Sequence, residues 1–449
     1  MRGWDRRIWL PLGCLAALIV LNPIAAKATD LLGVYRLAQA NDPTYAAARH
    51  TLDAALQQVP QARAGLLPKL DLTGNYNQTD ANASFTGIPI NNRNVYAWTW
   101  TLQLTQPLLR FSNVYAYREA EAKALQAREV FEAARQDLIL RVAQAYFDVL
   151  VAQEGVYAAQ AQLDAMREQL QQAQHGFKSG LVAVTDVYEA QAKEARAQSE
   201  LDGAKNDLAA KRAELDRVTG VSAGRLAALR RIVVMPQPKP DALEPWVAQA
   251  SEDNPAVLAQ RAALRAASSD VGKNRAENLP TLDLTASYGG NYSSGSILNP
   301  TNFSTRADAS VVGLQLTIPV YEGGAIDSQV AQARANEYQA RSQLEEARRK
   351  AVAEAKEAYL AIGTGVSQIQ ALQTSVEAGR ESVKGNRIGY RLGIRIDSDV
   401  LSAEDQLYAA RRDLAKARYD TLLQGLKLKA AAGVLGVSDL ATINALLEE

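Results

Sequence analysis

The sequence has few of the residues that build most catalytic and metal centres. Among 449 residues there is one cysteine, Cys14, and two histidines, His50 and His175. Cys14 lies inside an N-terminal apolar run, so removal of that run leaves no thiol and no disulfide. Neither histidine has a nucleophile or carboxylate partner at useful spacing, and no phosphate-binding glycine motif follows a strand. The sequence therefore predicts no enzyme, no cofactor and no metal site.

The sequence also has no excess of charge. It contains 49 basic and 49 acidic side chains, a balance that gives no reason to expect nucleic acid as a partner. At the N-terminus three arginines precede an apolar run at 10–21, and Ala26-Lys27-Ala28 follows. This pattern predicts a signal peptide over residues 1–28. After it there is no run of 18 or more apolar residues, the minimum for a spanning helix. If the chain crosses a membrane, strands must do it.

One motif, L-P-x-L-D-L-T, occurs twice, at 67–73 and at 279–285. The two prolines, Pro68 and Pro280, are 212 residues apart (280 − 68). The same offset relates two further pairs of segments: Asp42-Pro43 with Asn254-Pro255, and Gln106-Pro107-Leu108 with Ile318-Pro319-Val320. Three anchors at one ungapped offset indicate a tandem duplication. We expect repeats at 29–240 and 241–449, each with a helix, a β-hairpin, a long helix and a returning helix.

Each repeat contains two segments in which apolar and polar residues alternate. Period-2 alternation is typical of strands with one apolar face. The predicted strands lie near 68–77, 95–106, 281–289 and 309–318. Each is about ten residues long, which is the length that crosses a bilayer when tilted. Two polar connections, at 78–94 and 289–306, are rich in Asn, Ser, Thr and Gly, and we expect both to be exposed loops.

Most of the remaining sequence has helical periodicity. Long segments from after Leu108 to about His175 and from Ala325 to about Arg387 carry apolar residues at heptad spacing. A helix of about 65 residues reaches roughly 100 Å, more than a compact domain needs. Shorter helices return from Thr185 to Val218 and from about Val400. Residues 29–67 are also helical, with a break at Asp42-Pro43, and the proline-rich segment 235–240 links the repeats.

Together these features resemble the outer membrane efflux protein family. The resemblance rests on the paired strands, on P-V-Y-E-G-G at 319–324, and on two helical turns at 177–187 and 390–401. It implies an α+β membrane protein: a homotrimer with a shared twelve-stranded transmembrane β-barrel and a periplasmic α-barrel of long coiled-coil helices. Independently, four strands per chain are too few to close a barrel, and open edges do not survive in lipid. Chains must therefore combine, and three chains give twelve strands.

The family resemblance also implies a function and partners. It implies a passive exit duct in the outer membrane of a Gram-negative bacterium, with a periplasmic helical extension. The duct would serve efflux or type I protein secretion, together with a periplasmic adaptor (membrane fusion) protein and an inner-membrane transporter of the RND or ABC type. A second hypothesis is a periplasmic coiled-coil structural or adaptor protein without a pore. The paired strands separate the two, since an adaptor needs no lipid-facing apolar stripe.

The resemblance assigns roles at the two helical turns, which form the periplasmic tip in the family. By motif, Thr185 would pair with Arg395 and Asp186 with Tyr390, latching neighbouring helix pairs. Asp399 would line the pore constriction and recur three times around the trimer axis. The family's type member has a second acid three residues further on, where this chain has Ser402. The sequence therefore does not decide whether a second acidic ring exists. The alternative is that Thr185, Asp397 or Ser398 caps a helix and that the acids interact favourably with its dipole. The exported substrate, the partner pump and the resting state of the channel are not encoded in any motif.

Overall fold

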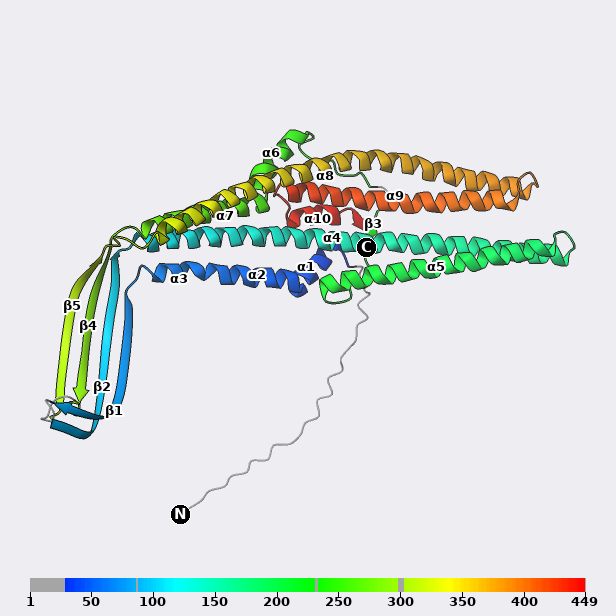
Figure 1. The fold of residues 1–449 in the computed structure, drawn as a ribbon. Helices are drawn as coiled ribbons and strands as arrows, with labels where there is room; N and C mark the ends of the chain where they lie inside the picture. The colour runs from blue at the N-terminus through cyan, green and yellow to red at the C-terminus, as the bar shows by residue number, and fades with distance from the viewer. Residues whose placement is uncertain (1–28, 86–87, 231–232, 298–302, 449) are drawn as a thin grey trace, which may run out of the picture.

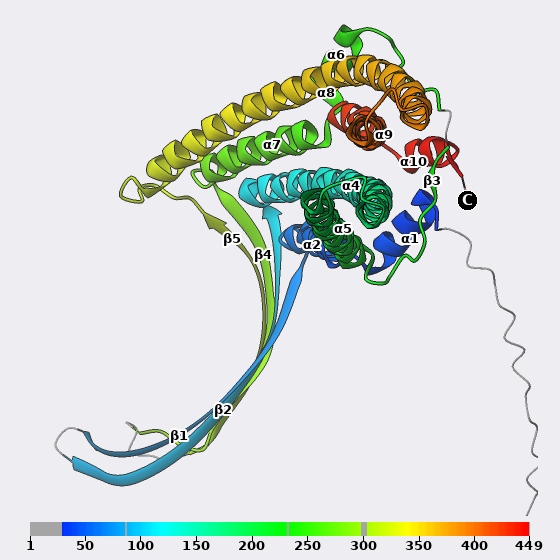
Figure 2. The same cartoon turned by 90° about the vertical axis from the view of Figure 1, so that its right-hand side faces the viewer.

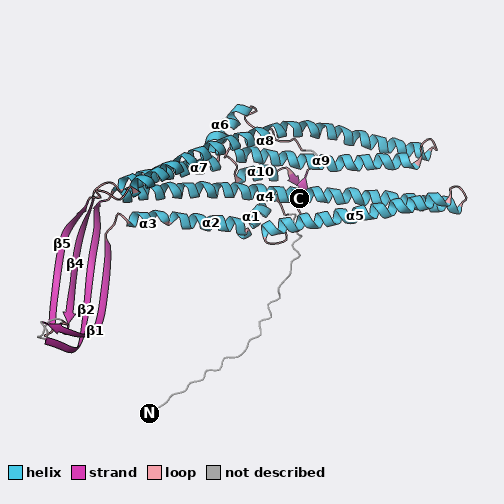
Figure 3. Cartoon of the chain, in the orientation of Figure 1, coloured by secondary structure: helices cyan, strands magenta, loops and turns pink. Residues whose placement is uncertain are grey.

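The computed structural model describes residues 29–85, 88–230, 233–297 and 303–448. The predicted signal peptide, 1–28, lies outside the described residues. The chain has two regions that meet at an angle (Figure 1): a curved sheet at one end and a long bundle of helices. Figure 3 shows that nearly all of the strand structure lies in that one sheet.

The sheet consists of two hairpins, one from each repeat. Its strands are β1 (Lys69–Phe85), β2 (Ile88–Leu109), β4 (Thr281–Ser293) and β5 (Thr305–Thr317). They are antiparallel and lie in the order β1-β2-β4-β5. The register places Leu72 opposite Leu102, and Leu102 opposite Tyr288. The apolar residues of the four strands therefore share one face, and the sheet curves away from the helices (Figure 2).

The prediction of a loop over 78–94 was wrong. The ladder between β1 and β2 continues through this polar stretch, with Gln78 opposite Tyr96 and Asp80 opposite Asn94. β4 likewise continues past Gly289 to Ser293. The physical reason is that a hairpin pairs backbone N–H and C=O groups whatever the polarity of the side chains. Apolar alternation identifies only the part of a strand that contacts an apolar medium.

The helices of the first repeat are α1 (Leu31–Asn41), α2 (Pro43–Leu56), α3 (Gln58–Ala64), α4 (Phe111–Lys178) and α5 (Val184–Thr219). Those of the second are α6 (Leu243–Asp253), α7 (Pro255–Ala276), α8 (Ala325–Arg391) and α9 (Asp397–Ala431), followed by α10 (Val437–Asn444). The predicted segment 29–67 has an additional break at Gln57. Pro60 explains it, because its missing N–H leaves the carbonyl of Leu56 without a helical partner.

The densest packing lies midway along the bundle, in a region we call the equator. Leu138, Val142 and Tyr146 of α4 are fully buried there, against residues of α1, α9 and α10. The hydroxyl of Tyr146 donates to the carbonyl of Ala227 at 2.6 Å. Two short strands, β3 (Ala228–Leu229) and β6 (Leu447–Glu448), pair at the same level and join the ends of the repeats. The equator therefore fixes the two repeats to one another.

Two helical hairpins, α4/α5 and α8/α9, extend from the equator to the end of the molecule farthest from the sheet (Figure 1). α4 has 68 residues and α8 has 67, so each is about 100 Å long. Among the described residues, no helix combines the length and the apolar character needed to cross a membrane.

Candidate functional site at the two helical turns

The far ends of the two helical hairpins, which we call the tip, are closed by the same backbone structure. Gly180 and Gly393 adopt left-handed φ values of 71° and 72°. In the first turn Leu181 N–H donates to the Gly176 carbonyl at 2.8 Å, and in the second Ile394 N–H donates to Gly389 at 2.9 Å. This six-to-one bond after a left-handed residue is a Schellman closure, which glycine forms without steric cost.

The two turns differ in the side chain that packs against the last turn of the preceding helix, α4 in one case and α8 in the other. A Cβ on Gly176 would lie 3.1 Å from Val182, and a Cβ on Gly389 would lie 2.7 Å from the Arg395 side chain. Val182 and Arg395 occupy equivalent positions, 213 residues apart (395 − 182). The glycine thus makes room for an apolar side chain in one turn and for a cation in the other. Only the second turn carries a charge at this position.

The acids at the start of each returning helix make local contacts. Asp186 accepts a hydrogen bond from the N–H of Ala183, the N-cap of α5, at 3.1 Å. Asp399 lies 3.4 Å from Arg395 in an ion pair with side chains 36% and 58% exposed. Thr185 is exposed in the first turn of α5. Within one chain both carboxylates therefore make local contacts: Asp186 completes the cap of α5, and Asp399 pairs with Arg395 four residues earlier.

Tyr390 connects the two helical hairpins. Its hydroxyl donates to Gln172 Oε1 of α4 at 2.9 Å. The residue that motif comparison pairs with it is Asp186, on the other side of the first turn. Gln172 was not predicted from the sequence, and its only signal is an exposed polar position in the last turns of α4. The latch between neighbouring helix pairs stays a prediction, since one chain contains only its own two hairpins.

A second contact between the hairpins lies closer to the equator. Leu401 of α9 is buried with Leu163 and Met166 of α4 and with Leu201 of α5. Beside it the Arg387 guanidinium donates to Glu404 Oε1 at 2.6 and 2.9 Å. Glu404 is 7% exposed, and hydrogen bonding to it raises the pKa of Arg387. Leu163, Met166 and Leu201 lie at the heptad positions that the sequence predicts, whereas the contacts of Leu401 and of Arg387 with Glu404 were not predicted.

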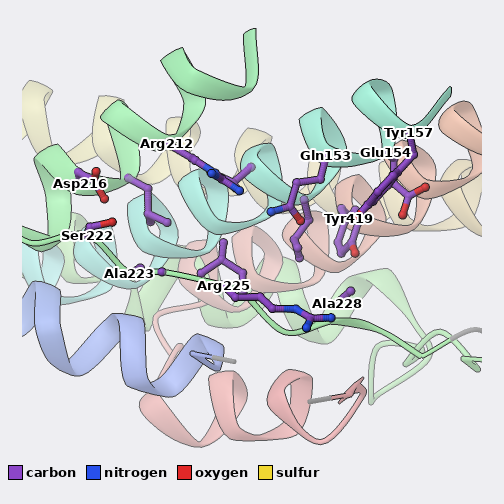
Figure 4. Close-up of a pocket in the computed structure, with 15 residues that line it drawn as sticks. Gln153, Glu154, Tyr157, Arg212, Asp216, Ser222, Ala223, Arg225, Ala228 and Tyr419 are labelled. Atoms are coloured by element: carbon purple, nitrogen blue, oxygen red, sulfur yellow. The ribbon is translucent and has the colours of Figure 1, made fainter. Parts of the chain in front are cut away.

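A polar cavity of about 430 Å³ lies at the equator, between α4, α5 and the segment that follows α5. Glu154 and Tyr419 lie at one end and Asp216 and Ser222 at the other (Figure 4). Burial raises the pKa of Glu154, although Arg411 partly opposes this. None of the sequence-predicted site residues lines this cavity. Among the described residues there is no cluster of His, Cys, Asp or Glu able to hold a metal ion.

Comparison with known proteins identifies the family to which the chain belongs. The model of the family described as "Outer membrane efflux protein" matches residues 34–221 and 246–434, one match in each repeat. The chain belongs to the outer membrane efflux protein family. The protein is accordingly a passive exit duct of the outer membrane with a periplasmic helical extension.

Individual relatives of this efflux family cover nearly the whole chain. Outer membrane protein TolC of Escherichia coli strain K12 is 33% identical over 433 residues, 93% of this chain and 85% of that protein. Alkaline protease secretion protein AprF of Pseudomonas aeruginosa is 32% identical over 435 residues, 96% of this chain and 89% of that protein. At this coverage each alignment includes both repeats.

Solved structures share the fold. The outer membrane channel CmeC of Campylobacter jejuni matches with a TM-score of 0.78 and 19% identity, covering 93% of this chain and 90% of that one. The outer membrane protein VceC of Vibrio cholerae matches with a TM-score of 0.74 and 20% identity, covering 90% and 96%. The long helical hairpins and the hairpin sheet therefore recur in both of these solved structures.

Proposed function

We propose that three copies of this chain form one continuous duct, with a shared twelve-stranded barrel in the outer membrane and a helical tube below it. The observation that carries the proposal is the sheet, in which β1 and β5 each leave one edge unpaired. Backbone groups in lipid must all be paired, so a four-stranded sheet has to continue into other copies until it closes. The proposed duct performs no chemistry of its own.

The exposed apolar face of the sheet favours the duct over a periplasmic coiled-coil protein without a pore. On the edge strands Leu72 is 71% exposed and Leu314 is 66% exposed. Soluble proteins rarely leave a contiguous apolar surface of this kind in water. Facing lipid, the same residues form the outer band of a barrel, while Thr101 and Gln315 on the opposite face line the lumen.

We further propose that the tip is the gate. Thr185, Asp186, Tyr390 and Arg395 would latch neighbouring helix pairs, and Asp399 would line the narrowest point. Three carboxylates in a narrow passage concentrate negative potential and favour multivalent cations. The ion pair between Arg395 and Asp399 lowers that potential. With Ser402 in place of a second acid, one ring supplies the whole cation site.

The proposed partners are an adaptor protein of the periplasm and an inner-membrane transporter of the RND or ABC type. Energy for export has to come from such a pump, since the duct is passive. Both export classes have support among the relatives: the name of AprF refers to secretion of a protease, and the family description refers to efflux. Capture of the transporter with the tagged duct, followed by mass spectrometry, distinguishes the two classes.

The test of the duct is single-channel recording in lipid bilayers. Purified protein should conduct ions, and a trivalent cation complex added on the tip side should block the current. Asp399→Ala should abolish the block and leave the trimer intact, whereas Arg395→Ser should strengthen it by freeing the carboxylate. A water-soluble monomer that fractionates with the periplasm would overturn the duct. A block unchanged in Asp399→Ala would place the constriction elsewhere.

A further inference from the structure

The apolar face of the sheet changes character along its length. At the end near the helices this face carries leucines, among them Leu70, Leu282 and Leu316. In the half farthest from the helices (Figure 1) it carries aromatic residues from three strands, namely Tyr76, Tyr96, Trp98, Trp100, Tyr288 and Tyr292. Tyrosine and tryptophan have an apolar ring and a polar tip, which suits a boundary between lipid and water. The aromatic end of the face therefore has the chemistry of such a boundary.

Two charged residues lie on the same face, beside the rings. Arg306 of β5 lies opposite Tyr292, which in turn lies opposite Trp98 of β2. Asp308 follows Arg306 by two residues, so its side chain points to the same face. We call this group of residues the outer patch; it consists of Tyr96, Trp98, Trp100, Tyr288, Tyr292, Arg306 and Asp308.

The rings and the charged pair form one connected surface. The Trp98 and Tyr292 rings are stacked, with centroids 5.9 Å apart and planes 21° apart. Gly290 leaves room beside them for polar atoms. A Cβ on this glycine would lie 2.8 Å from Trp100 Nε1 and 2.6 Å from Asp308 Oδ1. An indole N–H and a carboxylate therefore converge on one point of the surface.

The outer patch lies at the height where the apolar band of a barrel ends. From Leu316 to Arg306 the strand β5 advances ten residues (316 − 306), which is about 33 Å. At the tilt of about 40° that is usual for barrel strands, this corresponds to a height of about 25 Å, the height of the apolar band. The placement rests on the proposed duct, in which this face meets lipid. The patch is then level with the lipid headgroups on the side of the membrane away from the helices.

We propose that the outer patch binds the headgroup of a phosphorylated glycolipid in the outer leaflet. Such a headgroup combines phosphate groups with sugar rings, whose C–H faces pack on aromatic rings. Trp98 and Tyr292 supply the aromatic surface, and Arg306 supplies the cation. The Arg306 side chain is 69% exposed, and its Nε lies 3.6 Å from Asp308 Oδ2, which is too far for a hydrogen bond. This ion pair leaves the guanidinium with donors for a phosphate, which arginine binds with two N–H groups at once.

Asp308 favours a sugar over a simple anionic phospholipid. A carboxylate beside the arginine repels a phosphate, so it weakens the binding of a ligand that offers only negative charge. The hydroxyl and amide groups of an amino sugar, in contrast, donate hydrogen bonds to a carboxylate. The patch combines a cation, an acceptor and an aromatic surface, and these three features together match a phosphorylated amino sugar.

Lipid binding to the purified trimer tests the site. The probe is a glucosamine disaccharide lipid with two phosphates, and native mass spectrometry in neutral detergent measures the lipid bound as its concentration rises. Arg306→Gln should weaken binding about tenfold, because a charge-assisted hydrogen bond is lost. Arg93→Gln is the matched control. Arg93 lies opposite Ala81 at the same end of the sheet but on the face of Thr101, so its removal should leave binding unchanged.

Two further ligands and two further variants test the chemistry of the site. The same lipid without phosphates should bind the parent protein about as weakly as the phosphorylated lipid binds Arg306→Gln. Phosphatidylglycerol should bind the parent protein about tenfold more weakly than the glycolipid. Asp308→Asn should narrow that difference, because it removes a repulsion from the phospholipid and an acceptor from the sugar. Trp98→Leu keeps an apolar side chain but removes the ring, and it should weaken glycolipid binding several-fold.

Equal binding of the glycolipid to the parent protein and to Arg306→Gln would overturn the site. Equal losses in Arg306→Gln and Arg93→Gln, or equal binding of phosphatidylglycerol and the glycolipid, would also overturn it, because either result assigns the binding to charge alone. Bilayer recordings separate this failure from failure of the duct. If the parent protein conducts ions but shows no preference for the glycolipid, the site is wrong and the duct stands. If the protein is monomeric and does not conduct, the duct itself is wrong.

Discussion

The equator and the tip of the helical body differ in what holds them together. At the equator the side chains of Leu138, Val142 and Tyr146 are fully buried. At the tip Leu181 is 81% exposed and Ile394 is 75% exposed. The same long helices pass through both regions, so helix propensity does not explain the difference. Packing fixes the equator, whereas the tip depends on a few polar contacts.

This difference shows how a long helix hairpin can be stable and still open at one end. The ion pair between Arg395 and Asp399 is exposed, and an exposed pair contributes about 0–1 kcal/mol. Burial of one large side chain at the equator contributes several times more. The tip can therefore separate at a cost far below that of unfolding the bundle.

The largest expected difference in stability comes from truncating a buried tyrosine at the equator and an exposed tyrosine at the tip. Tyr146→Ala removes a fully buried ring and its hydrogen bond to Ala227, so we expect a loss of about 3–5 kcal/mol. Tyr188→Ala, at a tip residue that is 65% exposed, should change stability by about 0.5 kcal/mol or less. Thermal unfolding followed by circular dichroism measures both. Equal losses would show that the tip is packed in the assembled protein.

Alkaline pH should weaken the equator. Burial is the main cause that raises the pKa of Tyr419 to about 12 from its ordinary value of 10.0. Because the folded state keeps this proton longer than the unfolded state, stability is complete below pH 10 and falls as pH rises toward 12. The loss approaches about 3 kcal/mol at one tyrosine, at 1.36 kcal/mol per pKa unit. Denaturant titrations across this pH range should show a shallower decline for Tyr419→Phe, and an unchanged slope would assign the loss to other groups.

Two left-handed glycines sharpen the comparison further. Gly433, which follows α9 at the equator, has φ 76°, and Gly393 at the tip has φ 72°. Alanine at either position incurs backbone strain of about 1–2 kcal/mol. At Gly433 the new Cβ would also collide with the backbone of Asp253, whereas at Gly393 it meets open space. Gly433→Ala should therefore lower the melting temperature more than Gly393→Ala. The reverse order would mean that the tip turn is crowded in the trimer.

The smallest effect on stability, and the clearest on conductance, should come from the predicted latch. Tyr390→Phe removes the donor to Gln172, and Arg395→Ser removes the partner of Asp399. Each change should lower stability by about 1 kcal/mol or less. Together they should raise single-channel conductance, because Tyr390 joins the two hairpins and Arg395 is predicted to pair with Thr185. An unchanged conductance in the double variant would exclude a gating role for these residues.

The sequence predicted the parts of the fold that depend on local pattern. The motif at Pro68 and Pro280 located the starts of β1 and β4, because alternation begins directly after each proline. Heptad spacing located the long helices, and α4 ends three residues beyond the expected His175. The length of the first hairpin was missed, since a ladder of backbone bonds leaves no signature in polar side chains.

Contacts between the helical hairpins could not be predicted in the same way. Sliding one heptad helix along another by seven residues, about 10 Å, leaves the apolar pattern unchanged. Periodicity therefore leaves the axial stagger of the hairpins open, and this stagger brings Tyr390 to Gln172 and Leu401 to Met166. The residues of the turns were identified by motif, whereas their partners depend on tertiary packing.

The length of α4 has a mechanical consequence. From Leu150, in the equatorial core, to Lys178, at the end of the helix, about 28 residues form an arm of roughly 42 Å. A rotation of about 6° about the equator moves the end of this arm by roughly 4 Å, while atoms about 8 Å from the pivot move less than 1 Å. Side-chain packing absorbs displacements of that size by small sliding of helices. If the tip is the proposed gate, the helix pair acts as a lever that converts a sub-ångström adjustment in a dense core into a change of several ångströms in the aperture.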